Sequence, residues 1–457
     1  MKNILKALSI CILSLALVSP ALAKSVLKEN KFDKIIKSNE INKTATIAVS
    51  IREAKSGKVI YENEQDKLLN PASTLKLISS VAAIDTLGKD YCFKTQLLID
   101  KDSNVYIKLG ADPLLTSNDL KVLIKSLRNK QYKSVNNVYI DDSIFDNVDW
   151  GTGWMWDDNT NPYMTKFSAY NLDNNVLKIN VTKNTQGEGT NVQPLNLYPM
   201  AIINKVVHGS SSNISVNRYD WQSPDIIELT GTVNSPIIAS VPINNMRRYF
   251  SYQIEDFLNR NNIKYNNQNF TSKITPANAL LIGETTHEIT AALPLILKQS
   301  DNRTAETIAK LAAAKANNST ATNELTKKLL VDFYTKKQVP TDKIVFADAS
   351  GVSRNNLIST DWISFALHKL YCANYFDALQ DYMAQPGEGT LNNRLLDQRG
   401  NVWLKTGSIS NASGISGFVK SQSGNFYTIS ILVQNFIQPQ SEAKKLEDEI
   451  IKAVYDL

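Results

Sequence analysis

The chain has 457 residues, of which 43% are hydrophobic and 21% are charged, and this composition excludes a largely disordered protein. The net charge of +6 comes from 50 basic and 44 acidic residues without a basic block, so no nucleic-acid partner is expected. Three cysteines and three histidines are too few to indicate a disulfide scaffold or a Cys/His zinc site.

The N-terminal segment has the pattern of a secretory signal peptide. Two lysines precede an apolar run over residues 7–18, and small residues occupy the A-x-A cleavage positions at 21–23. The run is too short to span a bilayer, and the alternative interpretation is a buried N-terminal helix. We therefore expect residues 1–23 to be removed and the mature chain to be periplasmic, without a transmembrane helix. In that oxidising compartment Cys92 and Cys372 could pair, but the sequence does not show whether they are close enough.

The start of the mature chain predicts a helix, a strand hairpin and a buried helix, in that order. Residues 24–43 indicate a helix, and the alternation over 44–52 indicates a strand. A Ser-Gly turn leads into a second strand over 58–61, which completes the hairpin. The next helix opens at 71–73, has apolar residues suited to burial, and is stopped by Gly88.

The middle of the chain, from about residue 96 to 283, has a different texture. Short strand-like runs at 96–99, 104–109 and 135–140 alternate with loops rich in Asn, Gly and Ser. Exposed turns are expected over 183–192 and 208–213. One helix is clear, because Met246, Phe250, Ile254, Phe257 and Leu258 share a face.

Helices return after residue 284, and the chain ends with strands and a final helix. An alanine-rich helix over 305–316 is followed by a second helix near 325–333. Strand-like runs then cover 402–405, 417–420 and 426–433, with Gly407 and Gly424 in the turn regions between them. The two ends of the chain therefore predict one discontinuous α/β domain that carries an insertion.

Three short motifs stand in the order Ser73-Thr74-Leu75-Lys76, Ser300-Asp301-Asn302 and Lys405-Thr406-Gly407. Each is weak by itself, because Ser-x-x-Lys also occurs at 25–28 and 441–444, and because serine and asparagine are common helix caps. These three copies differ from the others because each falls at the boundary of an expected helix or strand. We therefore interpret them as parts of one catalytic site.

The first motif indicates a serine nucleophile with a lysine base. Ser73 opens the predicted helix, and Lys76 lies one turn later on the same face, within reach of the hydroxyl. A serine hydroxyl needs a neighbouring base to become a good nucleophile, and a lysine can serve once burial and nearby cations lower its pKa. The alternative is a helix-capping serine followed by a surface lysine.

The other two motifs supply polar groups to the same site. Ser300 and Asn302 stand between two predicted helices, where their side chains can face a cleft. At a predicted strand end, Lys405 can place its charge over the nucleophile, and Gly407 leaves room for close approach of the backbone. The hydroxyls that can bind a substrate carboxylate belong to Thr406 and Ser408.

This set of motifs is the signature of penicillin-binding proteins and serine β-lactamases. The chain most resembles the low-molecular-mass class C penicillin-binding proteins, which are D-alanyl-D-alanine carboxypeptidases and endopeptidases. Segments similar to that family's motifs lie at 71–77, 109–113, 154–158, 348–355, 387–391 and 405–408. Ala349 replaces a glycine of the family pattern, Val352 a leucine, and Ser408 stands where threonine is frequent, which puts only local loop shape in doubt.

The resemblance implies a serine β-lactamase/transpeptidase-like α/β domain that is interrupted by two smaller nested domains. The catalytic domain would comprise residues 24–95 and 284–457. An inserted second domain would comprise 96–167 and 244–283, with a third domain nested within it at 168–243. The long interval between the first two motifs agrees with this arrangement, since compact β-lactamases have a much shorter one.

The resemblance also implies a serine-type D-Ala-D-Ala carboxypeptidase or endopeptidase that acts on peptidoglycan stem peptides and is inhibited by β-lactam antibiotics. Ser73 would form the acyl-enzyme with Lys76 as base, and the backbone N–H groups of Ser73 and Ser408 would stabilise the oxyanion. Ser300 and Lys76 would relay a proton to the leaving group, and Asn302 would hold the substrate amide.

A further substrate contact is expected from the inserted region. In the resembling family, an aspartate in the segment matching Trp154-Met155-Trp156-Asp157-Asp158 meets the ammonium group of the third stem-peptide residue. Asp158 is our candidate, because two acids stand beside two large aromatic rings. Asp157 is an alternative, and both acids could also be solvated turn residues.

Two other functions fit the same motifs: a β-lactamase, and a non-catalytic peptidoglycan-binding protein. No metal or organic cofactor is expected. A Ser-His-Asp enzyme is not expected either, because His208, His287 and His368 lie outside every motif. The sequence leaves open the preference between carboxypeptidase and endopeptidase, the specificity for the third residue, the oligomeric state and membrane association.

Overall fold

The computed structural model describes residues 30–184, 187, 189–218, 226–267 and 269–457. The predicted signal peptide, residues 1–23, lies outside these ranges. Among the residues that the structure describes, no helix has the length and apolar character needed to cross a membrane.

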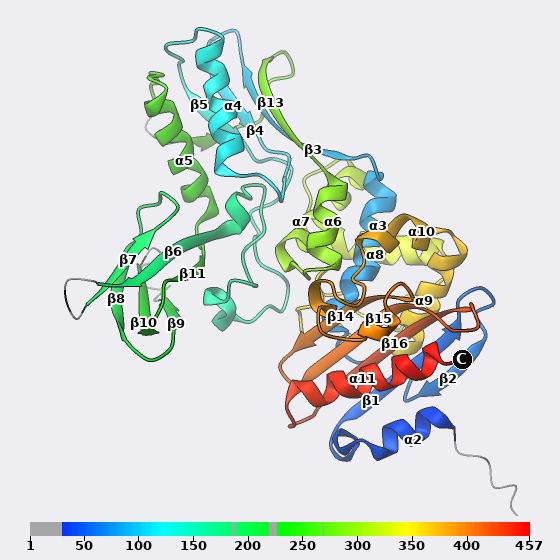
Figure 1. The fold of residues 1–457 in the computed structure, drawn as a ribbon. Coiled ribbons are helices and arrows are strands. Elements are labelled where there is room, and N and C mark those ends of the chain that lie inside the picture. The colour runs from blue at the N-terminus through cyan, green and yellow to red at the C-terminus, as the bar shows by residue number, and fades with distance from the viewer. Residues whose placement is uncertain (1–29, 185–186, 188, 219–225, 268) are drawn as a thin grey trace, which may run out of the picture.

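A five-stranded antiparallel sheet joins the two ends of the chain (Figure 1). The strand order is β14-β15-β16-β1-β2, so the first strand of the chain pairs with the last, and Ala48 lies opposite Leu432. The strands are β1 (Thr46–Glu53), β2 (Val59–Asn63), β14 (Val402–Ile409), β15 (Ala412–Lys420) and β16 (Phe426–Gln434).

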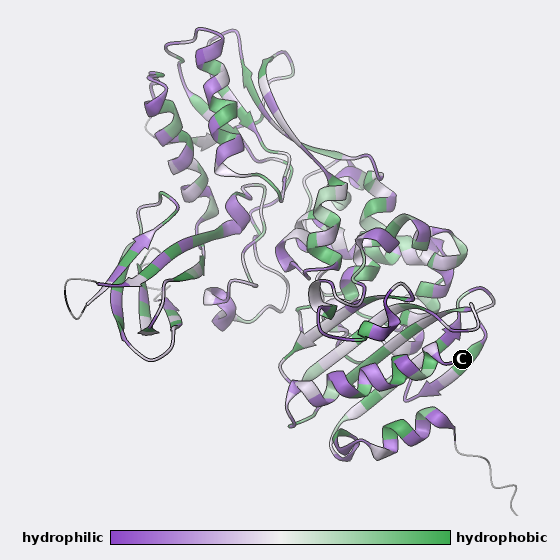
Figure 2. Ribbon diagram, in the orientation of Figure 1, coloured by the Kyte–Doolittle hydropathy of each residue, from purple (hydrophilic) through white to green (hydrophobic). Residues whose placement is uncertain are grey.

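Helices cover both faces of this sheet because its strands alternate in the direction of their side chains. On β1, Ile47, Val49 and Ile51 share a core with helices α2 (Lys31–Ser38) and α11 (Gln440–Tyr455). Ser50, on the opposite face, has its hydroxyl 2.7 Å from that of Ser364 on α9 (Thr360–Cys372). Figure 2 shows both apolar and polar residues along α11, as expected for a helix with one solvent-facing side.

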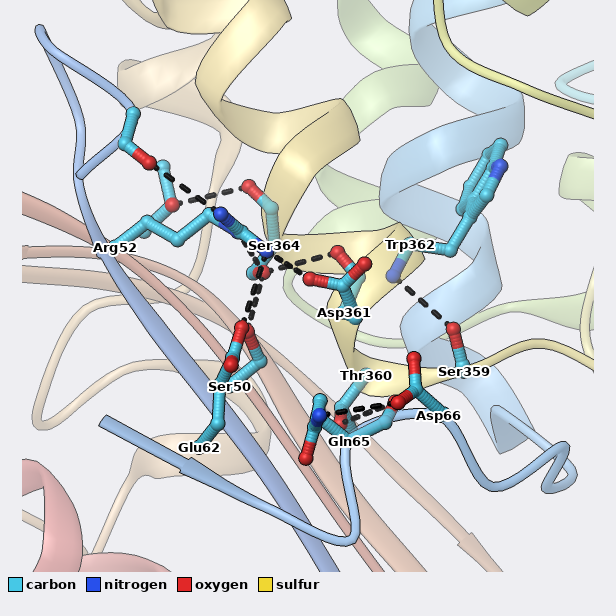
Figure 3. A network of polar contacts seen from close by, with 12 residues as sticks. Ser50, Arg52, Glu62, Gln65, Asp66, Ser359, Thr360, Asp361, Trp362 and Ser364 are labelled. Atoms are coloured by element: carbon cyan, nitrogen blue, oxygen red, sulfur yellow. Dashed lines mark hydrogen bonds and ion pairs between the residues drawn. The ribbon is translucent and has the colours of Figure 1, made fainter. Parts of the chain in front are cut away.

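A polar network fixes α9 to the sheet (Figure 3). Arg52 on β1 forms ion pairs with Glu62 on β2, at 3.2 Å, and with Asp361 in the first turn of α9. The Ser359 hydroxyl caps α9 by accepting a hydrogen bond from the Trp362 backbone N–H at 3.1 Å. This network lies among structural elements and contains none of the predicted site residues.

A helical layer packs beside the sheet and carries the first two motifs. Helix α3 is mostly apolar and buried, although Asp85 near its end is exposed, and Gly88 ends it with a φ of +90°. Helix α7 is buried along most of its length and packs against α3. The helices of this layer are α3 (Leu75–Leu87), α6 (Ile289–Leu297), α7 (Asn302–Asn317), α8 (Asn323–Lys336) and α10 (Tyr375–Leu379).

The middle of the chain forms three further sheets. A mixed sheet in the order β12-β5-β4-β3-β13 packs with two helices, and two three-stranded sheets follow the orders β8-β10-β9 and β11-β6-β7. The first group comprises β3 (Cys92–Ile99), β4 (Val105–Lys108), α4 (Ser117–Asn129), β5 (Val138–Asp141), α5 (Met246–Arg260), β12 (Thr271–Ser272) and β13 (Leu280–Glu288). The small sheets comprise β6 (Val176–Lys183), β7 (Thr190–Pro194), β8 (Ala201–His208), β9 (Asn213–Arg218), β10 (Ile226–Val233) and β11 (Ile237–Pro242).

The chain enters and leaves this middle region through one antiparallel pair of strands. Cys92 on β3 lies opposite Glu288 on β13, and the pairing continues to Ile99 and Leu280. This ladder therefore extends past the proposed domain limits at 95 and 284. The exact division into domains stays a prediction.

Two local expectations are wrong. Gly407 is not in a turn, because β14 continues through Thr406, Gly407 and Ser408, and Gly407 pairs with Gly414 of β15. Glycine has low strand propensity, but pairing with β15 continues the strand through this position. The expected turn over 183–192 is also shorter, because β7 already begins at Thr190.

Candidate active site

The first motif forms a short 3-10 turn that runs directly into α3. Ser73 lies in the turn Ala72–Thr74, and Lys76 lies in the first turn of the helix. The Lys76 ammonium donates to Ser73 Oγ at 2.8 Å. Ser73 makes no side-chain capping bond. The hydroxyl therefore faces Lys76, in contrast to the alternative of a helix-capping serine.

Lys76 is completely buried and its Nζ has three acceptors. Besides Ser73 Oγ, these are Asn302 Oδ1 at 2.5 Å and the Ser350 carbonyl oxygen at 2.7 Å. Burial lowers the pKa of Lys76 to about 8, while the nearby acids, led by Asp348, oppose this shift. The three acceptors fix the position of the amine, and its lowered pKa makes the neutral form accessible.

The second motif lies between α6 and α7. Ser300 adopts the left-handed backbone region, with a φ of +65°, and its Oγ accepts a hydrogen bond from Lys405 Nζ at 2.8 Å. Asn302 starts α7, and its side-chain N–H group donates to the Tyr163 carbonyl at 2.8 Å. Asp301 has a structural role instead, because its side chain caps α7 by accepting from the Thr304 N–H.

The third motif brings a second buried lysine to the site. Lys405 is fully buried, and its Nζ donates to the Thr406 carbonyl at 2.7 Å as well as to Ser300. Burial, together with the charge of Lys76, holds the pKa of Lys405 well below its ordinary value. The Thr406 hydroxyl donates to the Thr390 hydroxyl at 2.7 Å.

Gly407 is in close contact with Ser73, the predicted nucleophile. A Cβ atom at this position would lie 2.7 Å from the Ser73 backbone nitrogen and 2.9 Å from the Ala72 Cβ. Any side chain here would therefore push β14 away from Ser73. Only glycine allows the strand to approach the turn so closely.

These groups meet at one cleft of about 500 Å³. The catalytic part of the chain contributes Ser73, Asn302 and Ser408 to its lining, and the middle region contributes Asp157 and Asp158. Lys76 and Lys405 are not among the lining residues, since both are buried. The predicted residues that line this cleft are therefore Ser73, Asn302, Ser408 and Asp158. The lining does not include Lys76, Ser300, Lys405, Thr406 and Gly407.

The expected environment of Asp158 is wrong in one respect. Trp154 is buried and donates its indole N–H to Asp348 at 2.8 Å, whereas Trp156 is 77% exposed and lines a different pocket. Trp156, Asp157 and Asp158 are consecutive residues of the 3-10 turn Trp156–Thr160, where neighbouring side chains point about 120° apart. Trp154 precedes this turn and packs with Met164 and Phe167 instead. Asp158 is nevertheless half-buried, and burial followed by the charge of Asp157 raises its pKa.

The comparison with protein families decides the identity. The family model described as the D-Ala-D-Ala carboxypeptidase 3 (S13) family matches residues 28–455. The chain belongs to this family.

Individual relatives agree with this S13 assignment. The chain is 24% identical to D-alanyl-D-alanine carboxypeptidase DacB of Haemophilus influenzae, over 80% of this chain and 81% of that protein. It is also 24% identical to a D-alanyl-D-alanine carboxypeptidase of an Actinomadura species, over 83% of this chain and 76% of that protein.

Solved structures show the same fold. The crystal structure of penicillin-binding protein 4 from Haemophilus influenzae matches with a TM-score of 0.82 and 21% identity, over 94% of this chain and all of that one. A complex of that protein with a β-lactam matches with a TM-score of 0.78 and 20% identity, over 94% of this chain and 100% of that chain. The predicted fold class, the resemblance and the assignment to a serine hydrolase family are confirmed.

Sequence reasoning missed two acids behind the S13 site. Glu306 lies one helical turn after Asn302, is buried, and accepts hydrogen bonds from the backbone N–H groups of Ala349 at 3.0 Å and Ser350 at 2.8 Å. It therefore holds the loop whose Ser350 carbonyl binds Lys76. Burial raises the pKa of Glu306 to about 8.

Asp348 is the second of these acids. Its carboxylate accepts from the N–H groups of Gly351 at 2.8 Å and Ser353 at 2.7 Å, besides Trp154. Gly351 has a φ of +81°, and a Cβ there would lie 1.8 Å from the Ala72 carbonyl oxygen, so this loop packs directly on the nucleophile's turn. The segment 348–355 was recognised as a family motif, but its spacing alone gave no role.

The remaining candidates lie away from the S13 site. His287 bonds to Asp112 at 2.6 Å, while His208 and His368 bond to backbone carbonyls. Cys92 and Cys372 are both free. Within the described ranges, no group of three or more His, Cys, Asp or Glu side chains is arranged to hold a metal ion.

Proposed function

We propose that this protein hydrolyses peptidoglycan stem peptides that end in D-Ala-D-Ala, through an acyl-enzyme on Ser73. The observation that carries the proposal is the 2.8 Å contact between Lys76 Nζ and Ser73 Oγ, in a cleft that a substrate can enter. Membership of the S13 family supports the same substrate class. Such a substrate lies outside the cytoplasmic membrane, so we place the mature protein in the periplasm.

Acylation begins with proton transfer from Ser73 Oγ to neutral Lys76. The oxygen attacks the carbonyl of the penultimate D-alanine, and the negative oxygen is stabilised by the backbone N–H groups of Ser73 and Ser408. The peptide bond then breaks, and D-alanine leaves as an amine after it receives a proton through Lys76 and Ser300. In deacylation, water attacks the ester and releases the shortened peptide and free Ser73.

The remaining site residues bind and orient the substrate. Ser408 lines the cleft, and Lys405 and Thr406 precede it on β14, so we assign all three to the side of the site where the terminal carboxylate would bind, with Gly407 allowing the strand to approach. Asn302 would hold the substrate amide by donating to its carbonyl oxygen, once the side-chain N–H group of Asn302 turns from the Tyr163 carbonyl. Asp158 would pair with the free amine of the third stem residue.

Carboxypeptidase and endopeptidase action use the same acyl transfer. They differ only in whether the leaving amine is free D-alanine or the side-chain amine of a second stem peptide. Digestion of purified peptidoglycan separates these products. The β-lactam complex of the Haemophilus relative supports inhibition of this protein by β-lactams.

The decisive experiment is covalent labelling with fluorescent penicillin, followed by mass spectrometry of the labelled peptide. We expect one adduct on Ser73, none in Ser73→Ala, and release of D-alanine from a pentapeptide by the wild type alone. A label that lasts minutes or longer indicates a penicillin-sensitive peptidase, whereas rapid release indicates a β-lactamase. Absence of any label would favour a non-catalytic binding protein.

A further inference from the structure

A shallow pocket adjoins the catalytic cleft on the other side of the 3-10 turn Trp156–Thr160. Two acids of this turn line the cleft with Ser73, whereas Trp156 and Asn159 line the neighbouring pocket. Met164 belongs to both linings. The two hollows therefore adjoin each other on either side of this turn.

Trp156 is the unusual feature of this pocket. The residue is 77% exposed, although tryptophan is normally well covered in a folded protein. Trp150, which is partly exposed, adds apolar surface to the same pocket, and the buried residues Pro242 and Ile243 lie at its base. An exposed aromatic ring that forms the wall of a pocket beside a cleft is typical of a ligand contact.

The charges and polar groups of the pocket favour a neutral ligand. Lys166 is the one charged residue of the lining, and it is paired with Asp149 at 3.1 Å. Asn159 and Asn244 contribute side-chain amides, which bond well to hydroxyl and acetamide groups. A pyranose ring with an acetamido group meets both requirements, because its C–H face packs on tryptophan while its edge is polar.

The size of the pocket indicates one unit of a longer molecule. Its volume is about 150 Å³. Pockets that hold a whole small molecule measure roughly 300 Å³ or more. A single ring is thus too weakly enclosed to bind alone with high affinity, but the adjoining cleft of about 500 Å³ anchors the peptide end.

We propose that the pocket beside Trp156 binds an N-acetylated amino sugar of the glycan strand to which the stem peptide is attached. This inference rests on the proposed function, because the cleft must hold the peptide for the sugar to reach the pocket. The sugar contact would select stem peptides still attached to glycan over free peptides.

The test compares two substrates that share one pentapeptide, of which only one carries the disaccharide. In Trp156→Ala we expect KM for the disaccharide substrate to rise about fivefold or more, with kcat unchanged and the free pentapeptide unaffected. Trp156→Tyr keeps an aromatic ring and should retain most of the affinity. Penicillin acylation, which involves no sugar, should be the same in all variants.

A binding measurement tests the pocket without turnover. The free disaccharide, titrated to millimolar concentration, should quench the tryptophan fluorescence of the wild type and much less that of Trp156→Ala. Ile437→Ala is the matched control, because Ile437 is 86% exposed and lies outside the pocket.

Three results would overturn the sugar site. The first is an equal KM for both substrates in the wild type. The second is an equal rise in KM for both substrates in Trp156→Ala. The third is that the disaccharide does not quench the tryptophan fluorescence of the wild type. The second result would identify the peptide stem as the occupant. If the proposed function is wrong, the result differs from these three. The wild type then cleaves neither substrate, while the disaccharide still quenches its tryptophan fluorescence.

Discussion

Two lysines of the site are buried without an acid in direct contact. The Nζ of Lys76 and that of Lys405 donate only to hydroxyl, amide and carbonyl oxygens, and neither lysine takes part in an ion pair among the described residues. An ammonium group that has lost water without gaining a carboxylate releases its proton more easily. This arrangement lets Lys76 act as a base near neutral pH.

The pH dependence of acylation follows from this. Because the pKa of Lys76 is about 8, the neutral fraction grows with pH up to that value. The rate of penicillin acylation should rise about tenfold per pH unit on the acid side and level off above it. Stopped-flow measurement of fluorescent penicillin binding checks this. Lys76→Arg should be acylated slowly at every pH. A wild-type acylation rate that does not change with pH would contradict the assignment of Lys76 as the base.

Glu306 predicts an opposite dependence of stability on pH. Burial raises the pKa of Glu306 from 4.5 to about 8, so folding takes up a proton between these values and stability falls as pH rises through them. Between these two pH values, the Glu306 carboxyl should lower the free energy of unfolding by up to about 1.4 kcal/mol for each pH unit. Urea unfolding from about pH 5 to pH 8 should show this in the wild type and a flatter profile in Glu306→Gln.

Glu306→Gln removes the titrating carboxyl but keeps its hydrogen bonds. Oε1 of Glu306 accepts from both backbone N–H groups, and the amide oxygen of glutamine can do the same. Glu306→Leu removes both acceptors and should also slow acylation, since Ser350 would no longer be fixed near Lys76. Identical profiles of wild type and Glu306→Gln would show that this carboxyl does not change its protonation on folding.

Asp158→Asn should have a selective effect on substrates. The cleft position of Asp158 predicts weaker turnover of peptides that carry a free amine on the third residue, by about tenfold for the loss of one charged contact. Penicillin has no such amine, so its acylation rate should stay unchanged. Asp157→Asn is the comparison, and equal losses on both substrates would indicate a folding defect.

At the scale of elements, strong periodicity was enough to predict structure. The apolar stripe of α5, the alanine-rich α7 and the alternation in β1 were all found. The small sheets of the middle region were not predicted. β8 exposes most of its positions and has no clear buried face, whereas β9 alternates regularly but is only six residues long. The end of β14 was misplaced because its last residues are held by pairing with β15 rather than by propensity.

In the site, too, some features were predictable from the sequence and others depend on the fold. Its five motif residues were identified from order and spacing, although their roles stay proposals. Glu306 was missed because an acid within an alanine-rich helix resembles a surface residue in sequence, and only the fold shows that α7 is buried there. The separation of Trp154 from Trp156 depends on a 3-10 turn that no periodicity announces.

The contact between β14 and the nucleophile's turn predicts the effect of Gly407→Ala. The new Cβ would meet the Ser73 nitrogen at 2.7 Å, so the strand must shift away from the oxyanion site. We expect acylation to fall by about a hundredfold or more and stability to fall by about 1–3 kcal/mol. Labelling rates and urea unfolding measure the two effects.

Gly424→Ala is the matched control for this substitution. Gly424 also has a φ outside the range of most residues, at +88°, but no atom lies within 4 Å of an added Cβ. It should lose some stability through backbone strain while acylation stays normal. A comparable loss of acylation in both variants would show that general destabilisation is the cause.

At the scale of the whole molecule, the middle region is fastened to the catalytic part along α7. Polar groups on successive turns of this helix bind residues of the middle region. These are Asn302 to Tyr163, Arg303 to Pro113, Thr307 to Asn171, and Lys310 to Asp146. The cleft between the two parts therefore depends on α7 as a shared wall.

Lys310→Met tests this attachment. Lys310 is 1% exposed and donates to Asp146 and to the Val148 carbonyl, so its loss leaves both acceptors without a cation. The free energy of unfolding should fall by about 2 kcal/mol, less than for a fully buried pair because Asp146 is partly exposed. Lys328→Met removes a surface ion pair with Asp332 and should change stability by less than about 0.5 kcal/mol. Equal urea midpoints for both variants would contradict the role of Lys310.

The pairing of the first strand with the last has a consequence for biosynthesis. Ser73 leaves the ribosome early, whereas Lys405 and β14 are among the last residues made, and the sheet that unites them needs β16 beside β1. A nascent or truncated chain that lacks β14 therefore contains Ser73 without Lys405, and it should not form an acyl-enzyme. Because such long-range pairing is slow to form, a chain of this design stays inert until its last strands have been made and have paired with its first.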